Sequence, residues 1–460
     1  MRLSLAAILL SLSGFSRPQQ IGHLVSEDRP KIYIHNCTKA GGCTKTVKHV
    51  TVDANWRPFH DVNGKKPCLS KAGKWDPVLC PDELACAKNC ALEGVDYARD
   101  IGVNSTGEAL NLKLVTNGAL GKNVGSRLYL LDRDGKYVML KLKNQEFSFE
   151  IDVSELPCGV NGALYLSAMD ADGGASSNNK AASSYGTGYC DAQCPHAVKF
   201  LGGKVNMQNW TSTGPGTGNG RLGSCCTELD IWEANTMSQA FTLHPCKTKG
   251  PTQCTDKACS SLCDGSGCDF ASYRLGAHDF YGPHKTIDTT KKFSVVTQFI
   301  THDGTSSGSL VEIRRLYVQN GRVIQNSKTK LGSLKPFDSI TKEFCKATRA
   351  FFNETNVFQE DGGMARMGAA LERGMVLTFS LWDDHSDQPM LWLDGQPDNR
   401  GTCTAQGSNV TKTEEENPGT SVKFSNIRVG DLNTTFPFAS SATGRASKSK
   451  PSLTAHGRRN

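Results

Sequence analysis

Residues 225–235 of this 460-residue chain read Cys-Cys-Thr-Glu-Leu-Asp-Ile-Trp-Glu-Ala-Asn and place three carboxylates within six positions. Because side chains alternate between the two faces of a strand, Glu228 and Asp230 point the same way. Glu233 would point to the opposite face of a regular strand. One extra residue, a β-bulge near Ile231 and Trp232, would return it to the face of the other acids. The stretch therefore predicts a bulged strand that carries a single row of carboxyl groups.

Such a row can perform acid–base chemistry. Like charges close together raise one another's pKa, so one carboxyl group keeps its proton while another stays charged. Two carboxyl groups about 5 to 5.5 Å apart are typical of retaining glycoside hydrolysis. A solvated strand face is the alternative interpretation of a Glu-x-Asp-x-x-Glu pattern. The intervening Leu229, Ile231 and Trp232 indicate that one face is packed, which favours the catalytic interpretation.

The stretch also resembles the signature of glycoside hydrolase family 7, the fungal-type cellulases. Further colinear segments resemble that family at residues 156–165, 169–174, 186–195, 380–384, 392–394 and 424–427. The resemblance implies an all-β, concanavalin-like jelly-roll sandwich with long disulfide-braced loops that form a cleft. It also implies a secreted retaining β-1,4-glucanase that hydrolyses internal bonds of cellulose and related glucans by double displacement.

The resemblance assigns roles to individual residues. Glu228 is the nucleophile, and Glu233 is the general acid and then the base. On chemical grounds, we expect a protonated Asp230 to share its proton with Glu228 and so help to keep Glu228 charged. His244 matches a family histidine near the acid row, and a purely structural histidine is the alternative. The candidate substrate-binding residues are Trp382, Trp392, Trp56, Tyr165, Tyr189, Asp191, Gln193, Lys199, Arg274 and Arg400. Without the family match, the three tryptophans would be assigned to core packing.

The N-terminus has the pattern of a secretory signal. Met1 and Arg2 precede an apolar run that ends near residue 12, and small residues follow, so we expect a signal peptide at residues 1–16. The run is too short to span a bilayer. The 18 cysteines are an even number, which indicates disulfides rather than zinc ligands in a secreted chain. The family resemblance implies the pairs Cys37–Cys43, Cys68–Cys90, Cys80–Cys86, Cys158–Cys403, Cys190–Cys226, Cys194–Cys225, Cys246–Cys263, Cys254–Cys259 and Cys268–Cys345.

Strand-like segments dominate the rest of the chain and favour one catalytic domain over residues 17–437. A hairpin is predicted from residues 127–131 and 137–142 around a turn at 133–136. Further strands are predicted at 147–153, 293–300, 310–319, 375–382 and 422–429, and a short helix at 81–92. Residues 438–460 are rich in Ser, Ala, Lys and Arg, so we expect a disordered basic tail and no cellulose-binding module.

Composition excludes several classes of partner. The net charge is +7, but five basic residues lie in the tail, and the remaining +2 argues against a phosphate-binding surface. Six Asn-x-Ser/Thr sites predict a glycoprotein. We expect a β-1,4-glucan polysaccharide as the substrate, no nucleic-acid or membrane partner, no cofactor, no metal, and an extracellular monomer.

Endo action is favoured over chain-end action by departures from the exo-acting members of the family. Pro58 stands where those members carry an entrance tryptophan, and the segment between Cys246 and Cys268 is shorter. His385 begins a segment that replaces their tyrosine pair. Residues 211–223 keep a tunnel-like length, which favours the alternative, a cellobiohydrolase of the same family. A non-catalytic carbohydrate-binding lectin is the alternative from another class, since jelly rolls also bind sugars without cutting them.

Overall fold

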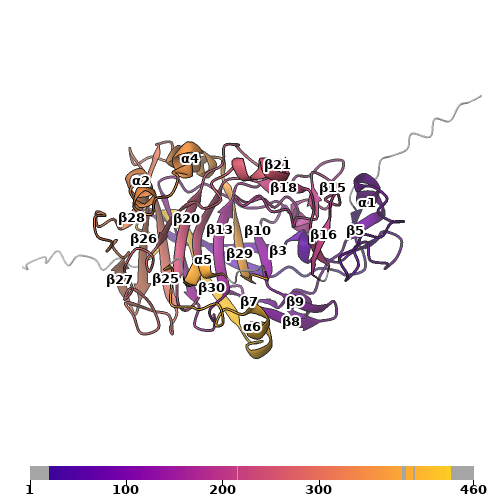
Figure 1. Cartoon of the computed structure of the whole chain (residues 1–460), viewed down its shortest axis with the longest axis horizontal. Coiled ribbons are helices and arrows are strands. Elements are labelled where there is room, and N and C mark those ends of the chain that lie inside the picture. The colour runs from indigo at the N-terminus through magenta and orange to yellow at the C-terminus, as the bar shows by residue number, and fades with distance from the viewer. Residues whose placement is uncertain (1–19, 215, 386–389, 397–398, 437–460) are drawn as a thin grey trace, which may run out of the picture.

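The fold is a β-sandwich whose strands come from the whole length of the chain (Figure 1). The computed structural model describes residues 20–436, except 215, 386–389 and 397–398. The predicted signal peptide at 1–16 and the predicted tail at 438–460 lie outside the described residues. Within the described part of the chain, no helix is both long and apolar enough to cross a membrane.

The largest sheet among the described residues has 17 strands and supplies both layers of the sandwich. Its strands are β2 (Lys31–Thr38), β3 (Gly42–Val52), β6 (Val103–Ser105), β7 (Ala109–Lys113), β10 (Ser126–Leu131), β11 (Met139–Leu140), β12 (Gln145–Asp152), β13 (Val160–Ser167), β19 (Glu228–Ala234), β20 (Gln239–His244), β22 (Cys268–Ala271), β25 (Phe293–Thr301), β26 (Leu310–Gln319), β27 (Arg322–Gln325), β28 (Ser339–Thr341), β29 (Met375–Asp383) and β30 (Ser421–Asp431).

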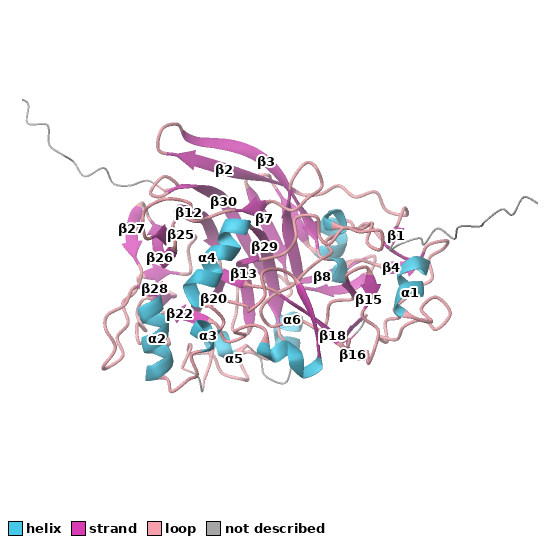
Figure 2. Cartoon of the chain, turned by 90° about the horizontal axis from the view of Figure 1, so that it is seen from above, coloured by secondary structure: helices cyan, strands magenta, loops and turns pink. Residues whose placement is uncertain are grey.

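Hydrogen-bonded neighbours define the two layers. One layer runs β3–β10–β29–β13–β19–β20–β22, and its central strands lie side by side in Figure 1. The other runs β6–β7–β30–β12–β25–β26. The β2–β3 hairpin, at the top of Figure 2, joins them because β2 also pairs with β30. The result is a nearly closed sheet, as the predicted all-β sandwich requires.

Short elements surround the sandwich. The remaining strands are β1 (Gln20–Ile21), β4 (Phe59–Asp61), β5 (Cys90–Leu92), β8 (Val115–Gly118), β9 (Gly121–Val124), β14 (Phe200–Leu201), β15 (Lys204–Val205), β16 (Thr211–Gly214), β17 (Thr217–Asn219), β18 (Leu222–Cys225), β21 (Thr252–Thr255), β23 (Tyr281–Gly282) and β24 (Ile287–Asp288). The helices are α1 (Glu83–Asn89), α2 (Lys342–Phe351), α3 (Val357–Glu360), α4 (Gly363–Arg373), α5 (Leu391–Asp394) and α6 (Val410–Glu416). In Figure 1, α1, α2, α4 and α6 lie at the edges of the view, and α5 lies in front of the central strands.

Aromatic side chains fill the space between the layers. Trp232 of β19 is fully buried and lies 6.3 Å from Phe149 of β12 and 5.8 Å from Phe293 of β25, measured between ring centroids. Phe379 of β29 contacts Phe424 of β30 at 5.5 Å. Edge-to-face pairs at these distances contribute about 0.5 to 1.5 kcal/mol each beyond area burial. This core holds β19 flat against the opposite layer.

The predicted hairpin at residues 127–142 is only partly correct. The turn forms, with the amide of Asp132 donating to the carbonyl of Lys136 at 2.7 Å. Next to the turn, Tyr137 forms an antiparallel bridge with Leu131, as the prediction requires. Beyond it, the second predicted strand is reduced to Met139–Leu140, which pairs with β29. The strand β10 also pairs with β29, further along the same strand. The strands β10 and β11 therefore both pair with β29.

Other sequence predictions are confirmed. The strands expected at 147–153, 293–300, 310–319, 375–382 and 422–429 correspond to β12, β25, β26, β29 and β30, and the short helix corresponds to α1. All nine disulfides implied by the family resemblance are formed, and together they use every cysteine of the chain.

Candidate active site

The strand β19 carries the acid row, and it is bulged as the sequence predicted. Opposite β13, Asp230 and Trp232 face consecutive residues, so Ile231 is the extra residue. Opposite β20, a single residue faces both Ile231 and Trp232. The bulge restores the alternation, and Glu233 therefore lies on the same face of the sheet as Glu228 and Asp230.

The register of the neighbouring strands makes this face polar. Residues directly opposite one another in an antiparallel pair share a face. Glu228 faces His244, Asp230 faces Tyr165, and further along the layer Asn161 faces Trp382. The other side chains of these strands, such as the fully buried Leu164, enter the core. The candidate residues Tyr165, His244 and Trp382 thus lie on the face of the acid row.

Glu228 is almost inaccessible, with 5 % of its surface exposed. Its Oε2 accepts a hydrogen bond from the backbone amide of Ala192 at 3.0 Å. Burial, followed by the charges of Asp230 and Asp191, raises the pKa of Glu228 well above its usual range, and the Ala192 amide opposes that effect. Burial and Asp230 also raise the pKa of Asp191. At neutral pH the site therefore holds fewer negative charges than carboxyl groups.

Glu233 is half-buried and is suited to hold a proton. Burial, and then the charge of Asp230, raises the pKa of Glu233 to about 8. Its Oε1 accepts a hydrogen bond from the side-chain amide of Asn161 at 3.0 Å. This contact keeps the carboxyl group oriented along β13. Protonated at neutral pH and held by an amide, Glu233 has the properties of a general acid.

His244 has two partners. Its Nε2 lies 2.9 Å from Oδ2 of Asp230, and its Nδ1 lies 2.8 Å from the carbonyl oxygen of Asp264. Burial lowers the pKa of His244, but Asp230 outweighs burial and the resulting pKa is about 9. The imidazole is therefore charged at neutral pH. This ion pair competes with the expected sharing of a proton between Asp230 and Glu228.

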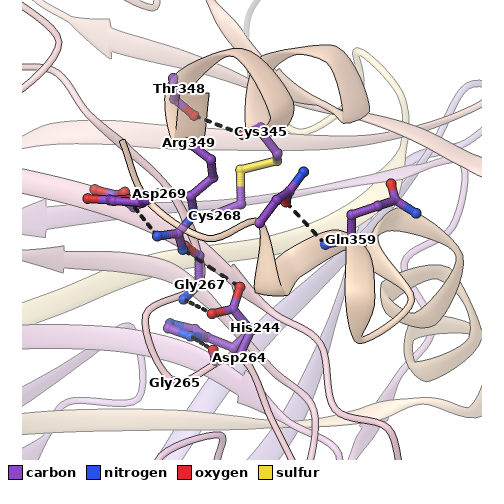
Figure 3. Close-up of polar contacts among 12 residues, drawn as sticks. His244, Asp264, Gly265, Gly267, Cys268, Asp269, Cys345, Thr348, Arg349 and Gln359 are labelled. Atoms are coloured by element: carbon purple, nitrogen blue, oxygen red, sulfur yellow. Dashed lines mark hydrogen bonds and ion pairs between the residues drawn. A yellow bond between two sulfur atoms is a disulfide. The ribbon is translucent and has the colours of Figure 1, made fainter. Parts of the chain in front are cut away.

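The loop that supplies the Asp264 carbonyl is itself held in place (Figure 3). The amide of Gly267 donates to Oδ1 of Asp264 at 3.0 Å, and Arg349 of α2 donates to the carbonyl of Gly267. The disulfide Cys268–Cys345 joins the end of this loop to α2. The orientation of His244 therefore depends on α2, which lies about 100 residues further along the chain.

A buried hydrogen-bond chain lies close to Glu228, whose charge acts on both of its tyrosines. The hydroxyls of Tyr165 and Tyr189 are 3.0 Å apart, and Tyr189 donates to Oδ2 of Asp191 at 2.7 Å. The backbone amide of Gln193 donates to Oδ1 of Asp191 at 2.9 Å. Burial raises the pKa of both tyrosines, so they act as neutral donors. The structure brings these four predicted residues together.

Lys199 and Trp56 lie together at another part of the site. Lys199 is buried, and its Nζ donates to the carbonyl of Asn55 at 2.8 Å, beside Trp56. Burial lowers the pKa of Lys199 to about 8. The guanidinium of Arg127 lies 5.5 Å from the Trp56 ring and 3.3 Å from the Tyr189 ring. Arg127 thus connects this pair to the tyrosines.

Trp382 and Trp392 form a stacked pair with ring centroids 6.2 Å apart and an interplanar angle of 29°. Trp392 exposes 37 % of its surface, which is unusual for so large an apolar ring. The pair offers a flat apolar surface at the end of β29. Core packing was the alternative interpretation of the tryptophans, and it does not apply to Trp392 because this ring is exposed.

Arg274 and Arg400 meet at Asp269 of β22, with nitrogen–oxygen distances of 3.2 and 2.6 Å. Both line a hollow of about 410 Å³ together with Asp264, Ser266, Asp269, Arg349, Glu354, Thr355 and Val357. Because Asp264 also holds His244, the hollow adjoins the acid row. The predicted arginines therefore belong to one polar hollow beside the acids.

Among the described residues, five clusters bring possible metal ligands together, and three of them contain cysteines that are already bound in disulfides. The other two contain a histidine. One ligand atom each of Glu228, Asp230 and His244 lie within 4.8 Å of one another, as do those of Asp383, His385 and Glu414. In the first cluster both imidazole nitrogens already have partners. The second is joined by contacts of His385 and Lys122 with Glu414. Each histidine thus has partners within the protein.

Several functional residues were missed in the sequence. Asn161 and Ala192 contact the two glutamates directly, and Arg127 forms an ion pair with Asp53 at 2.9 Å beside the tyrosines. Arg127 alternates with apolar residues in a predicted strand, which was a detectable signal. The backbone amide of Ala192 had no detectable signal in the sequence, because every residue type except proline carries a backbone N–H group.

Comparisons with known proteins agree with this geometry. The chain matches the model of Glycosyl hydrolase family 7 over residues 21–436. A GH7 family cellobiohydrolase from Daphnia pulex is 43 % identical, with a TM-score of 0.87 over 90 % of this chain and 99 % of that one. A cellobiohydrolase from Melanocarpus albomyces complexed with cellotetraose is 38 % identical, with a TM-score of 0.85 over 91 % and 100 %. Endoglucanase I complexed with cellobiose is 37 % identical, with a TM-score of 0.79 over 90 % and 100 %.

These structures share the jelly-roll fold that the sequence predicted, and they include both cellobiohydrolases and an endoglucanase. The match covers nearly all of the described residues and includes the bulged acid strand. The protein belongs to glycosyl hydrolase family 7.

Proposed function

We propose that this protein hydrolyses β-1,4-glucosidic bonds of cellulose and related glucans with retention of configuration. The observation that carries the proposal is the placement of Glu228 and Glu233 on one face of a bulged strand, in unlike surroundings. Glu228 is buried and accepts a hydrogen bond from a backbone amide, whereas Glu233 is half-buried and has a pKa of about 8. Unlike surroundings for two carboxyl groups are the basis for assigning separate roles to them.

In the first step, Glu228 attacks the anomeric carbon while Glu233 donates its proton to the departing sugar oxygen. The attack requires Glu228 to be charged, so a proton has to reside on a neighbouring carboxyl group such as Asp191. The raised pKa of Asp191 supports this location. The charged pair of Asp230 and His244 keeps a compensating cation beside the row.

In the second step, water hydrolyses the glycosyl ester. Esterification removes the charge of Glu228, which lowers the pKa of Glu233 and lets it accept a proton from the attacking water. Asn161 holds the carboxyl group of Glu233 through both steps.

The substrate we propose is a β-1,4-glucan chain. Sugar rings have apolar faces, and the stacked pair Trp382 and Trp392 offers a matching surface. Trp56 with Lys199 and the hollow with Arg274 and Arg400 offer further contacts for rings and hydroxyls. Two similar solved structures are complexed with cellobiose and with cellotetraose.

We propose endo action. Pro58, the short segment between Cys246 and Cys268, and the replaced tyrosine pair at His385 support it. Two disulfides, Cys246–Cys263 and Cys254–Cys259, close this short segment on itself. Chain-end action is the second candidate, because the two cellobiohydrolase structures have higher TM-scores than endoglucanase I. The hairpin of β16 and β17 also favours it.

The proposal is tested with two substrates. A rapid fall in the viscosity of carboxymethyl cellulose supports endo action, and release of disaccharide without that fall supports chain-end action. Proton NMR of early products from cellotetraose shows the β-anomer first if the configuration is retained. Glu228→Gln and Glu233→Gln are the matched controls. Wild-type activity no higher than that of Glu228→Gln would instead favour a lectin.

We also propose that residues 1–16 are removed on secretion and that residues 17–437 form one catalytic domain, acting as a monomer. Nine disulfides favour an oxidising compartment. N-terminal sequencing of the protein from culture medium tests the cleavage site. Light scattering of the same sample tests the oligomeric state.

A further inference from the structure

Arg315 is a fully buried arginine in the layer of the sandwich opposite the acid row. It belongs to β26, where side chains alternate between the outer and the inner face. The preceding Arg314 is exposed and pairs with Glu312 at 2.9 Å. The side chain of Arg315 instead enters the space between the layers. Two adjacent arginines on one strand thus have opposite environments.

The surroundings of Arg315 do not neutralise its charge. Its guanidinium carbon lies 4.2 Å from the ring centroid of Phe241 and 5.9 Å from those of Trp232 and Tyr317. No described carboxylate forms an ion pair with it, and its Nε and Nη1 have no hydrogen-bond partner. Burial lowers the pKa of Arg315, and the nearby Tyr317 opposes that effect. A guanidinium nevertheless stays protonated in proteins.

A buried cation without a carboxylate is not explained by stability. Desolvation costs several kcal/mol for such an ion, and an apolar side chain of similar volume is often as stable or more so. The rings around Arg315 recover part of that cost, since cation–π contacts contribute about 2 kcal/mol when desolvated. The position therefore calls for a function that an apolar residue would not perform.

The hydrogen bond of Arg315 to the backbone indicates that function. Its Nη2 donates across the sandwich to the carbonyl oxygen of Ile231, the extra residue of the bulge. A bulge disrupts the ladder locally and leaves a backbone group without its usual partner. A buried carbonyl left without any partner costs about 1 to 3 kcal/mol. Arg315 satisfies this carbonyl with a charged donor.

We propose that Arg315 is a positioning residue that holds the bulge of β19 from behind and so keeps Glu233 on the face of Glu228. It touches neither the substrate nor the acids. This inference rests on the proposed function, because it assigns to Arg315 the alignment of the general acid. Loss of the contact would let Ile231 relax and would move Glu233 away from Asp230.

Arg315→Met removes the charged donor and keeps an apolar side chain of similar length. Arg314→Met is the matched control on the same strand. We expect Arg315→Met to be folded, and its kcat on cellotetraose to fall by about 100-fold, the effect of a misplacement of roughly 1 Å. KM should change by less than about threefold, because the substrate contacts are elsewhere. Arg314→Met should match the wild type.

Two further measurements separate positioning from a merely structural role. Dinitrophenyl cellobioside has a leaving group that needs no proton, so Arg315→Met should recover most of its activity on this substrate. The alkaline limb of its pH profile on cellotetraose should also move below pH 8, since Asp230 no longer holds the pKa of Glu233 as high. A smaller amount of folded protein would by itself leave two quantities unchanged: the ratio of the activities on cellotetraose and dinitrophenyl cellobioside, and the pH of the alkaline limb.

The proposal is overturned if folded Arg315→Met keeps the wild-type kcat and alkaline limb. If this variant does not fold, the same measurements on Arg315→Leu decide, because leucine also lacks a donor for the Ile231 carbonyl. Unchanged ratios in Arg315→Leu also overturn it. Activity retained in Glu228→Gln or Glu233→Gln would show that the catalytic assignment fails, independently of Arg315.

Discussion

The backbone amide of Ala192 donates a hydrogen bond to Oε2 of Glu228 at 3.0 Å. Two disulfides hold the loop that carries this amide against the residues just before β19, namely Cys190–Cys226 and Cys194–Cys225. Because the two loop cysteines flank Ala192 on either side, the amide and the carboxylate are fixed by the same covalent frame. The cysteine pair that precedes the acid row in the sequence therefore supports the proposed nucleophile.

Removal of Cys194–Cys225 by alanine at both positions should reduce both stability and activity. The disulfide spans 31 residues, and we expect its loss to cost about 2 to 4 kcal/mol of unfolding free energy. The kcat should also fall, because the Ala192 amide is less well held. Urea unfolding and steady-state kinetics on cellotetraose measure the two effects. Removal of the peripheral Cys37–Cys43 is the control, and an equal kcat loss in both variants would contradict the prediction.

Glu233 should set the alkaline limit of activity. Its pKa of about 8 predicts that kcat/KM falls above pH 8 as the general acid loses its proton. Glu233→Gln should lack this limb and lose about 10²- to 10⁴-fold in kcat. Because the pKa is raised on folding, Glu233 costs stability as the pH rises from about 4.5 to 8.

The stability of Glu233→Gln checks the same pKa independently of catalysis. Its melting temperature should match the wild type below pH 4.5 and exceed it above pH 8. A difference that does not vary with pH would contradict the raised pKa.

His244→Asn should destabilise the protein by breaking its ion pair with Asp230. Removal of one partner from a buried pair costs about 3 to 5 kcal/mol. The pKa of His244 is raised to about 9, so its contribution is complete below pH 6.5 and is lost as the pH rises through 9. Urea unfolding at pH 6 and pH 9.5 should show the larger deficit at pH 6. The exposed His284→Asn is the control, and equal deficits at the two pH values would count against the pair.

Asp383 should weaken the fold above pH 6. Its side chain is 2 % exposed, and burial and the charge of Glu414 raise its pKa to about 6. Asp383→Asn should therefore be more stable than the wild type by about 1 to 3 kcal/mol at pH 7.5, with no gain below pH 3.8. Urea unfolding measures this difference. Glu416→Gln, an exposed change on α6, should have no effect, and a gain in that variant would contradict the assignment to Asp383.

Trp392→Ala should weaken the binding of long substrates. The ring stacks on Trp382 and is exposed, so its loss removes an apolar surface without opening the core. We expect KM for cellotetraose to rise about fivefold, equivalent to roughly 1 kcal/mol. Hydrolysis of a dinitrophenyl cellobioside, which spans fewer sugar rings, provides the comparison. An equal rise in KM for both substrates would argue against a role in holding the glucan chain.

Much of the fold followed from local patterns. The alternating segments at 147–153 and 310–319 became β12 and β26, because the period of a strand is visible in neighbouring residues. The hairpin at 127–142 was wrong in part, since its second segment found a better partner in β29, more than 200 residues away. Choices among competing strand partners depend on the whole core, and no local pattern encodes them.

The sequence by itself determined the acid row, the bulge and the all-β class, because these depend on residue spacing within one strand. The tertiary structure decided which groups surround each acid: Ala192 at Glu228, Asn161 at Glu233, His244 at Asp230 and Arg315 behind Ile231. Those contacts come from strands and loops separated by tens of residues, and only the register and packing of the two layers bring them within hydrogen-bond distance. The proton affinities that would assign the roles arise from the same burial, and they too are properties of the folded molecule.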